Sequence, residues 1–363
     1  IMGAVLDRNG LRPSRYYVTN DGYLILSSEV GVLPIAESRI KVKDRLRPGK
    51  MLLVDTVKGE LIDDDELKEK YATKQPYGEW LDNNLVQLHD LKIPNQKVPM
   101  HTKEERARLQ KAFGYTYEDL KTSILPMALN GSESIGAMGI DTPLAVLSNK
   151  HQPLFNYFKQ LFAQVTNPPI DSIREKVVTS TTVYLGTDGN VLEEKAENCK
   201  QLKINDPILT NTDLLKIKNM KVDGFKVETI PIIYYKNTSL EKAIDHLFVE
   251  VDRAHREGAN IIILSDRGVD ENHVAIPSLL AVSALQQYLV QTKKRTAMAV
   301  ILESGEPRDV HHFATLLGYG ASAINPYLAQ ESIQELIDLN MLDKDYYAAV
   351  DDYNNAILGG IVK

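Results

Sequence analysis

The chain has 363 residues, of which 43% are hydrophobic and 25% are charged, and its net charge is −7. These proportions are typical of a folded protein and exclude a disordered or fibrous chain, while the negative charge argues against general nucleic-acid binding, which needs concentrated Lys and Arg. No apolar run reaches the roughly 18 to 20 residues of a membrane span, and the first residues lack the basic and long apolar regions of a signal peptide, so we expect a cytoplasmic protein without membrane contact.

The length predicts two domains, or one large α/β domain with an appendage. Residues 1–60 are expected to form β structure. Apolar runs at 15–19 and 23–28 flank a turn at 20–22 whose Asn and Gly tolerate positive φ, which predicts a hairpin, and a third run at 50–56 is a candidate partner for it. An isolated hairpin must cover its apolar face, so we expect this segment to be the remnant of a larger sheet with an exposed apolar patch.

Residues 61–135 are expected to form a helical connector. Charged helical patterns separated by prolines predict three helices, at 67–74, 79–91 and 103–114. Thr116 begins a further helix, in which Asp119 is placed three residues later to complete a capping box.

Residues 136–345 carry the clearest pattern, that of an α/β domain. Strands are expected at 227–235, 260–266, 296–304 and 321–327, and helices at 239–258, 276–290 and 307–318. Short connections between such units imply a mainly parallel sheet with right-handed crossovers and flanking helices on both faces. The pattern leaves open whether the sheet is doubly wound or forms a (β/α) barrel or partial barrel. Residues 346–363 are expected to begin the link to a following domain.

Polar residues stand at the ends of the predicted strands, among them Asp266, Glu303 and Asn325. In parallel α/β sheets, ligands gather where strands end and helices begin, so these residues are candidates for a binding site. They are also explained as helix caps together with a buried pair between Asp266 and Arg267. Both interpretations stay open at this point.

Metal and thiol chemistry find little support in the sequence. Cys199 is the single cysteine, so the chain forms no internal disulfide and cannot hold an iron-sulfur cluster by thiolates. The adjacent His311 and His312 point about 100° apart on a helix, whereas zinc ligands prefer spacings of three or four residues. We therefore expect no metal site.

A stiff polar loop is expected at 164–175. Pro168 and Pro169 fix its path and hold Asn167 in an extended conformation, and Asp171 is placed to cap the next helix. Such a loop suits the wall of a passage lined by backbone groups, and it is equally explained as a stiff turn.

Three long segments together resemble the large subunit of glutamate synthase. The first, LDRNGLRPSRYYVTNDGYLILSSEVGV at 6–32, resembles the end of a class II glutamine amidotransferase domain. The second combines AMGIDTPLAVLS at 137–148 with YFKQLFAQVTNPPIDSIRE at 157–175. The third combines LSDRG at 264–268 with ESGEPRDVHHFATLLGYGASAINPYLA at 303–329. They follow the order of the family, and the resemblance covers essentially the whole chain.

The resemblance implies an internal fragment of an oxidoreductase that hydrolyses glutamine at one site, passes ammonia through a channel, and adds it to 2-oxoglutarate at a second site to make L-glutamate. It implies FMN and an iron-sulfur cluster in the parent, both outside this fragment, which is expected to hold no cofactor and to be inactive alone. The implied partners are the glutaminase and FMN domains of the same chain, with an electron-donating small subunit or ferredoxin. The choice among NADPH, NADH and ferredoxin stays open.

The resemblance carries few site residues into this chain, and none of them is catalytic. Asp7 matches the aspartate of the DRNGLRP motif, which in the family holds the amino end of glutamine, and a carboxylate pairs well with an ammonium. Met138, Thr166 and Asn167 match segments near the ammonia passage, where short polar groups would escort NH₃ and exclude bulk water. The leading expectation is a scaffold and channel wall between the glutaminase and FMN sites.

Two other functions remain as alternatives. One is an autonomous flavin or phosphate-ester enzyme on a (β/α) barrel, with its site at Asp266, Glu303 and Asn325. The other is a module that binds a regulator through the exposed connector helices. Flavin or phosphate at the strand ends would favour the first, and a pull-down with an intact parent subunit would separate the second from the channel wall.

Overall fold

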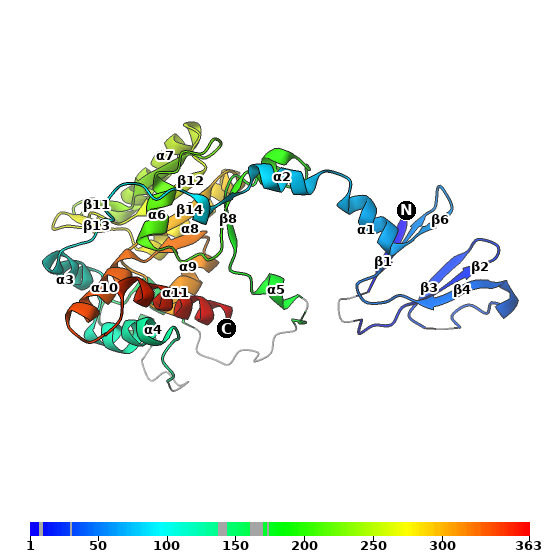
Figure 1. The fold of residues 1–363 in the computed structure, drawn as a ribbon, viewed down its shortest axis with the longest axis horizontal. Helices are drawn as coiled ribbons and strands as arrows, with labels where there is room; N and C mark the ends of the chain where they lie inside the picture. The colour runs from blue at the N-terminus through cyan, green and yellow to red at the C-terminus, as the bar shows by residue number, and fades with distance from the viewer. Residues whose placement is uncertain (7–9, 30, 137–143, 160–169, 173) are drawn as a thin grey trace. The chain divides into compact units, whose positions relative to one another are not determined.

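The computed structural model describes residues 1–6, 10–29, 31–136, 144–159, 170–172 and 174–363 (Figure 1). The chain divides into two compact units, which are described separately. The N-terminal unit comprises Ile1–Trp80 and Val165–Val178, and the α/β unit comprises Leu81–Gln164 and Thr179–Lys363. Within the described residues, no helix is both long enough and apolar enough to cross a membrane.

Two small antiparallel sheets form the β structure of the N-terminal unit. One has the order β1-β5-β6, with β1 at Met2–Val5, β5 at Met51–Asp55 and β6 at Glu60–Ile62. The other has the order β3-β2-β4, with β2 at Arg15–Thr19, β3 at Leu24–Ser27 and β4 at Ile40–Arg45. The predicted hairpin is confirmed, because β2 pairs with β3 and Gly22 adopts a φ of 86° in the turn between them.

One predicted pairing is wrong. The apolar run at 50–56 forms β5, which pairs with β1 and β6 and not with the hairpin. The third strand beside the hairpin is β4, whose sequence IKVKDR is exposed along most of its length. Apolar periodicity reveals a strand only where one face is buried, so it did not reveal this one.

The hairpin sheet presents the expected apolar patch. Tyr16 pairs with Leu26, and Val18 pairs with Leu24 and Val42, so these side chains share one face. Leu26 is 39% exposed and Val42 is 37% exposed. The described residues therefore leave this face partly uncovered.

Helix α1 (Asp64–Ala72) follows the first sheet and is fixed to it by charge. The side chain of Asp63 caps the helix by accepting a hydrogen bond from Asp65 N at 2.9 Å. The buried carboxylate of Asp64 pairs with Lys50 at 2.9 Å and with Lys68 at 2.8 Å. Asp64 therefore does more than complement the positive end of the helix dipole, because its carboxylate is buried and paired with two lysines.

The α/β unit is built on a parallel sheet with the order β10-β12-β14-β15. Its strands are β10 at Val227–Pro231, β12 at Ile261–Ser265, β14 at Ala299–Glu303 and β15 at Ala323–Asn325. The helices that follow these strands are α7 at Leu240–Arg256, α8 at Ser278–Gln291, α9 at Val310–Gly318 and α10 at Tyr327–Asp338. The prediction of a parallel α/β sheet is confirmed, and these four strands form an open sheet.

Both faces of this sheet are buried, as its continuous apolar strands predict. Successive residues of a strand point to opposite faces, so Ile261 and Ile263 lie in one apolar cluster while Ile262 and Leu264 lie in the other. The first cluster is covered by α6 (Asn211–Lys218) and by a small sheet of β7 (Val86–Gln87), β9 (Gln201–Ile204) and β8 (Val183–Gly186). The second is covered by the helices around α8 and α9.

Three predicted elements are shorter than expected, each for a local reason. The run 227–235 splits after Pro231, and Ile233–Tyr235 forms β11, which pairs antiparallel with β13 (His273–Ala275). The strand expected at 321–327 stops at Asn325 because Pro326 has no N–H to continue the ladder. The helix expected at 79–91 ends at Asn84 of α2 (Tyr77–Asn84), where the chain joins the small sheet through β7.

The connector supplies helices that pack on the α/β unit. Helix α3 (Lys103–Ala112) begins with a capping box between Thr102 and Glu105. The predicted capping box at Thr116 and Asp119 is confirmed, with bonds of 2.9 and 3.1 Å. It opens a wide turn of π-helix that leads into α4 (Leu125–Asn130).

Helix α11 (Tyr346–Val362) completes the described chain and packs against α4, α9 and α10. Its buried face includes Ala349, Tyr353 and Ile357. The hydroxyl of Tyr353 donates to the backbone oxygen of Arg308 at 3.0 Å, which satisfies the polar end of this buried ring.

Candidate functional site

The residues carried over from the family lie outside the described part of the chain. These residues are Asp7, Met138, Thr166 and Asn167. Just beyond the last two, Asp171 accepts a hydrogen bond from Arg174 N at 2.9 Å before α5 (Glu175–Val178), as predicted for a capping residue. The roles of the four residues stay predictions.

The structure does bring together Asp266, Glu303 and Asn325, which we call the strand-end cluster. They stand at the carboxyl ends of β12, β14 and β15, and neighbouring parallel strands end at the same edge of a sheet. Their exposed fractions are 1%, 3% and 0%, respectively. A ligand from solvent would therefore not reach them without displacing protein groups.

Asp266 binds the turn that follows β14. Its carboxylate accepts hydrogen bonds from Ser304 Oγ at 2.5 Å and from Gly305 N at 3.0 Å. Burial raises the pKa of Asp266 to about 7, although these hydrogen bonds act in the opposite direction. This carboxyl therefore fastens one strand end to the next loop.

Glu303 is neutralised by two cations. It accepts from Lys218 Nζ at 2.7 Å and from Arg267 Nε at 2.6 Å, and Ser265 Oγ donates to it at 2.7 Å. Burial alone would raise the pKa of Glu303, but the charges of Arg267 and Lys218 outweigh burial and bring that pKa below its usual value.

The charge network continues from Arg267 into α10. The guanidinium lies 3.4 Å from Glu331 Oε1 and stacks over the ring of Tyr327, 3.9 Å from its centroid. Glu331 is 0% exposed, and His101 Nδ1 lies 2.9 Å from its other oxygen. The predicted buried pair of Asp266 with Arg267 is therefore wrong, because Arg267 pairs with Glu303 and Glu331 instead.

Asn325 uses its amide to hold a neighbouring segment. Its Nδ2 donates to Leu209 O and to Asn211 Oδ1, both at 3.0 Å. The strand-end cluster as a whole is buried, and its acids are bound by groups of the same unit. It fits a structural role, and it offers a flavin or phosphate ester no free cation among the described residues of the cluster.

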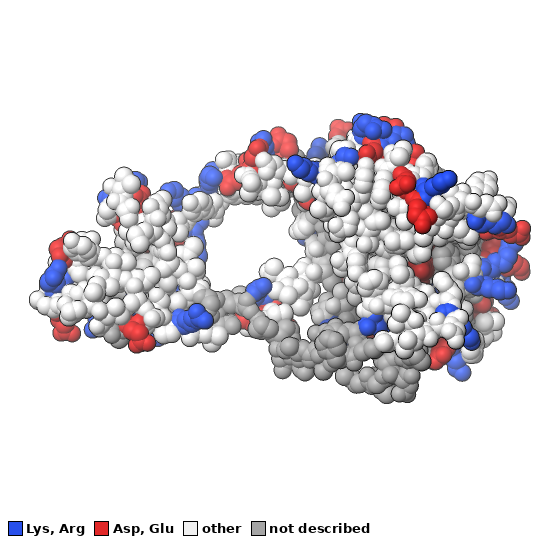
Figure 2. All heavy atoms as spheres, turned by 180° about the vertical axis from the view of Figure 1, so that it is seen from behind, with Lys and Arg blue, Asp and Glu red and all other residues white. Residues whose placement is uncertain are grey.

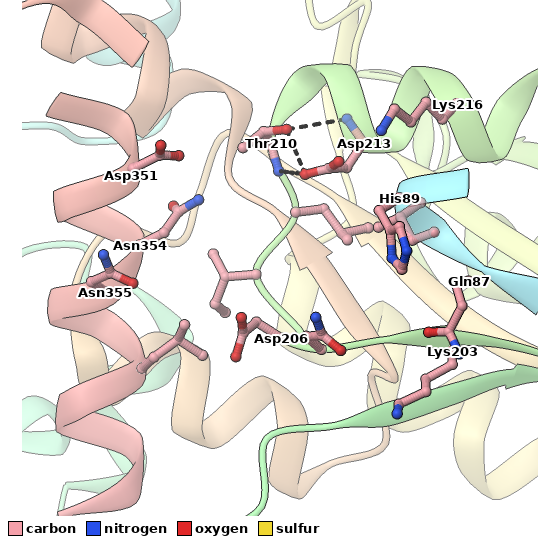
Figure 3. A pocket seen from close by; sticks show the side chains of 15 residues that line it. Gln87, His89, Lys203, Asp206, Thr210, Asp213, Lys216, Asp351, Asn354 and Asn355 are labelled. Atoms are coloured by element: carbon pink, nitrogen blue, oxygen red, sulfur yellow. Dashed lines mark hydrogen bonds between the residues drawn. The ribbon is translucent and has the colours of Figure 1, made fainter. Parts of the chain in front are cut away.

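A separate pocket of about 420 Å³ opens beside this cluster (Figure 3). Helix α11 forms one wall with Asp351, Asn354 and Asn355. The other walls come from the segment between β9 and α6, from the first part of α6, and from Gln87 and His89 near β7. We call this space the α11 pocket.

Backbone pairing fixes the floor of the α11 pocket. Ile208 forms a parallel bridge with Ile324, so the segment after β9 runs along the edge of the main sheet. Leu209 O accepts from Asn325 and also from Gln330 Nε2 at 3.0 Å. The floor is therefore attached directly to the strand-end cluster.

A capping box fixes the start of α6 at the rim of the same pocket. Asp213 N donates to Thr210 Oγ1 at 3.1 Å, and Thr210 Oγ1 donates to Asp213 Oδ2 at 2.6 Å (Figure 3). The carboxylate of Asp213 is thus committed to the helix start.

Three other charged side chains that line the pocket are not paired with another side chain of the described chain. Within the described chain, no side chain pairs with Lys203, Lys216 or Asp351. Figure 3 shows Asp351 on the α11 side and the two lysines on the other side. Burial, together with repulsion from Asp213 and Asp352, raises the pKa of Asp351 above its usual value.

The histidine pair of α9 takes part in packing. His311 Nε2 lies 2.9 Å from Phe155 O, and His312 stacks on the ring of Phe155 with a centroid distance of 4.3 Å. Burial lowers the pKa of His312 to about 4, so the ring is neutral near pH 7. Among the residues that the structure describes, no group of three or more His, Cys, Asp or Glu is arranged to hold a metal ion.

Basic and acidic side chains lie interspersed over the described surface that faces the viewer in Figure 2. Among the described residues, Arg253 pairs with the three carboxylates of Glu228, Glu250 and Glu257, so this basic side chain is balanced by acidic ones. A phosphate backbone needs a concentrated basic surface, and the described residues on this face show no broad one.

Sequence reasoning missed the α11 pocket. Its residues come from three stretches far apart in the chain, near 87–89, 203–216 and 351–358, and none of these stretches carries a motif. The available signal was weak: the Thr210 and Asp213 capping pattern and a polar stripe of Asp351, Asn354 and Asn355 at helical spacing.

Fold and site together define the class: an α/β domain whose strand-end acids are neutralised within the domain, joined to a module of antiparallel sheets. Residues 108–363 match the family described as Glutamate synthase central domain, and residues 1–80 match the family described as Glutamine amidotransferases class-II. The first match covers more than half of the chain, so the chain belongs to the glutamate synthase central domain family.

Whole-chain relatives agree with this assignment. The chain is similar to the glutamate synthase [NADPH] large chain of Bacillus subtilis, with 46% identity over 362 residues that span 100% of this chain and 24% of that one. It is 42% identical to the glutamate synthase [NADH] of Schizosaccharomyces pombe, over 99% of this chain and 18% of that one. It is 40% identical to ferredoxin-dependent glutamate synthase 2 of Synechocystis, over 100% of this chain and 24% of that one. The chain thus spans about a quarter or less of these relatives.

Among solved structures, a double mutant of flavocytochrome b2 with pyruvate bound has 19% sequence identity and a TM-score of 0.26, and covers 49% of this chain and 39% of its own. This similarity is too slight to carry an argument.

Proposed function

We propose that this chain forms the end of the glutaminase domain and the central domain of a glutamate synthase, where it acts as a scaffold and as part of the wall of an ammonia passage. The observation that carries the proposal is the family match at 108–363, together with 40 to 46% identity to glutamate synthases across the whole chain. The neutralised strand-end cluster supports a structural role, because its acids are bound to Lys218, Arg267 and neighbouring hydroxyls.

In the proposed parent, glutamine is hydrolysed at one site and the ammonia is added to 2-oxoglutarate at another, which yields L-glutamate after a two-electron reduction. Bound FMN would supply those electrons, and an iron-sulfur cluster would pass them to it. We place both groups outside this chain, whose single Cys199 offers one thiolate where a cluster needs several. The glutaminase and FMN domains of the same parent are the proposed partners.

The electron donor of the parent is set elsewhere in our proposal. The relatives named for NADPH, NADH and ferredoxin match this chain with similar identities of 46%, 42% and 40%. A segment that determined the donor would diverge more strongly between these classes. A small subunit or ferredoxin would therefore contact other parts of the parent.

The passage itself is assigned to Met138, Thr166 and Asn167, and Asp7 is assigned to the amino group of glutamine. Support comes from the resemblance of the surrounding segments to the family. It also comes from the described residues that precede Thr166 and Asn167 in the chain. There, Phe155 is 0% exposed and is held to α9 by His311 and His312. The chain is thus fixed to the α/β unit shortly before it enters the proposed passage.

Two finer predictions accompany this proposal. The open parallel sheet is interpreted as a partial (β/α) barrel, with the bridge from Ile208 to Ile324 extending its edge. The domain division is kept as 1–60 for the glutaminase remnant, 61–135 for the connector, 136–345 for the central domain and 346–363 for the start of the link to the FMN domain.

A domain exchange tests the proposal. This chain replaces the corresponding segment of the Bacillus subtilis relative, and the purified chimera is assayed for glutamate formation from glutamine and 2-oxoglutarate. We expect activity, because the segment is 46% identical throughout. A folded chimera that forms no glutamate from either glutamine or ammonium salts would contradict the proposal.

The chain alone provides the matched control. We expect neither glutaminase turnover nor a flavin absorption spectrum from the purified 363 residues. Turnover or a yellow preparation would show a self-contained enzyme and would favour the alternative flavin site.

A further inference from the structure

The sheet β3-β2-β4 of the N-terminal unit has a basic face on the side opposite its apolar patch. Side chains alternate between the two faces of a sheet, so Arg15 and Tyr17 of β2 point away from that patch. Strand β2 pairs with β4 so that Arg45 lies opposite Arg15. Lys43 lies opposite Tyr17, and its ammonium is 5.6 Å from the centroid of that ring, as expected for two side chains on one face. We call Arg15, Lys43 and Arg45 the basic face.

The charges of the basic face are not balanced within the described chain. None of the three cations forms an ion pair with a described residue. Asp44 lies opposite Tyr16 and therefore on the other face, where burial and the charge of Asp44 raise the pKa of Tyr16. Glu29 lines a small cavity with Arg15 and Tyr17, but it does not pair with the arginine among the described residues. The basic face therefore keeps a net positive charge.

The two arginines stand in an unfavourable position for a sheet without a partner. Leu46 N donates to Ser14 O at 2.8 Å, so these two residues form a hydrogen-bonded pair of the ladder. The next pair, Arg15 with Arg45, is then of the kind without hydrogen bonds, in which side chains lie closest and like charges destabilise the sheet. Cations on an edge strand keep other strands away, which explains Lys43 and Arg45 but not Arg15 on the central strand β2. An anionic partner would neutralise all three.

Strand β4 offers such a partner its backbone as well as its charges. It is an edge of the sheet, and no strand of the described chain pairs with its outer side (Figure 1). The N–H of Leu46 points toward β2, so every second N–H before it does so as well. The N–H groups of Lys43 and Arg45 therefore point outward, and that of Arg45 donates to the neighbouring Asp44 carboxylate at 2.7 Å. The backbone at Lys43 is open to a strand added at this edge.

Strand addition at this edge determines the chemistry of the partner. Successive residues of an added strand would alternate between the two faces of the sheet. Those on the basic face would meet Lys43 and Arg45, which favour carboxylates. Those on the other face would lie beside Val42, which is 37% exposed and favours apolar side chains. A nucleic acid offers the charge but has neither the apolar side chains nor a backbone that pairs with a β-strand.

We propose that the free edge of β4 binds an extended segment of another protein by β-strand addition, and that acidic and apolar residues alternate in this segment. The local charge supports this partner, because residues 10–50 hold eight Lys or Arg and four Asp or Glu, whereas the whole chain has a net charge of −7. A second copy of β4 would place its own cations against Lys43 and Arg45 and is disfavoured. The inference follows from this sheet alone and does not rest on the proposed function.

Synthetic peptides test binding to the purified 363-residue chain by fluorescence anisotropy. The probe is a labelled peptide of about eight residues, long enough to span β4, in which Glu and Val alternate. One control has the same composition with its Glu residues contiguous, and the other is the alternating peptide with every backbone nitrogen methylated. We expect each control to bind about tenfold or more weakly. Contiguous acids cannot all face the cations, and a methylated backbone cannot donate to the edge.

Substitutions locate the site. Lys43→Glu combined with Arg45→Glu reverses the charge beside the edge and should weaken binding of the alternating peptide by about tenfold or more. The matched control combines Lys58→Glu with Lys70→Glu, which changes the net charge equally at exposed positions of the same unit outside this sheet, and it should leave affinity unchanged. Circular dichroism shows that each variant is folded. In the unchanged chain, bound peptide should slow hydrogen exchange at the amide of Lys43.

The inference is overturned if the three peptides bind alike, or if the folded charge-reversal variant binds like its control. It is also overturned if a single-stranded oligonucleotide binds the basic face more tightly than the alternating peptide. A dimer of this chain that the charge reversal abolishes would overturn it as well, because a second copy would then occupy the edge. These outcomes are independent of the domain exchange, which measures glutamate formation.

Discussion

The two units of this chain differ in how they bury apolar surface. In the α/β unit, every residue of β12 and β14 is buried, and both faces of the main sheet are covered. In the N-terminal unit, β4 has no buried residue, and Leu26 is 39% exposed. The α/β unit carries its own core, whereas the N-terminal unit leaves apolar faces available to whatever packs beside it. We therefore expect the α/β unit to be the more stable of the two.

Glu303 forms half-buried ion pairs in the α/β unit, whereas Asp21 forms an exposed ion pair in the N-terminal unit. Removing an ion pair is expected to give the largest difference in stability between the units. Glu303→Ala would leave the half-buried Lys218 without its carboxylate partner and Arg267 with Glu331 alone, and should lower the free energy of unfolding by about 3 kcal/mol. Asp21→Ala breaks the exposed pair with Arg39 in the N-terminal unit and should have little effect on stability, because solvent screens both charges. Urea unfolding followed by circular dichroism and by hydrogen exchange of each unit measures both changes. Equal losses in the two variants would break the comparison.

The same leucine-to-alanine substitution, made once in each unit, is expected to give the next largest difference in stability. Leu302 is 0% exposed in the core, so Leu302→Ala should destabilise the α/β unit by about 2 to 5 kcal/mol. Leu26→Ala should change the N-terminal unit by less than about 1 kcal/mol, because that side chain already meets solvent. The same unfolding experiments report both values, and a large effect at Leu26 would show that its face is covered.

Asp266 in the α/β unit and Asp64 in the N-terminal unit should contribute responses to pH of opposite sign. The pKa of Asp266 is raised to about 7, so this carboxyl binds a proton in the folded unit that the unfolded chain has released, and its contribution to stability is lost as pH rises from about 4 to 7. Hydrogen bonds from Lys68 and Lys50 hold the pKa of Asp64 below its usual range, so the contribution of Asp64 to the stability of the N-terminal unit is lost as pH falls below about 4.

Asp266→Asn removes the contribution of Asp266 to the dependence of stability on pH. Relative to the unchanged chain, the variant should gain roughly 2 to 4 kcal/mol of stability between pH 4 and pH 7, measured by urea unfolding at each pH. A difference that stays constant over this range would show that Asp266 does not titrate there.

Substitutions at helix caps are expected to give the smallest changes in stability. At the caps we expect no difference between the two units. Thr102→Ala at α3 and Asp63→Ala at α1 each remove one hydrogen bond from a helix start and should each cost about 1 kcal/mol. The two effects should be similar because a cap is local to its helix. Hydrogen exchange in the first turn of each helix measures them, and a much larger loss at one cap would reveal a tertiary role.

Residue patterns predicted the parts of the fold in which burial and periodicity coincide. The runs that became β12 and β14 are apolar throughout, and the helix of α7 repeats apolar residues at helical spacing. The pattern failed where the local signal and the tertiary contact differ. Strand β4 is polar because it is exposed, and β7 lies inside a helical pattern because its pairing with β9 comes from more than a hundred residues away.

The candidate site was only partly predictable. The sequence placed Asp266, Glu303 and Asn325 at strand ends, which is correct, but it did not reveal that Lys218 comes from α6 to neutralise Glu303. It also did not reveal the α11 pocket, because Lys203, Lys216 and Asp351 come to line one pocket only in the folded chain. Partners of this kind depend on tertiary contacts that neither periodicity nor local motifs encode.

The most direct test of the account is Asn167→Trp in the active chimera. A bulky ring in the proposed passage should block ammonia that comes from glutamine, while ammonium salts still supply the synthase site from solvent. The account predicts that the ratio of glutamine-dependent to ammonium-dependent glutamate formation falls by about tenfold or more, a barrier change of about 1.4 kcal/mol. An unchanged ratio, with both rates intact or both reduced equally, would contradict the role of this chain as a channel wall.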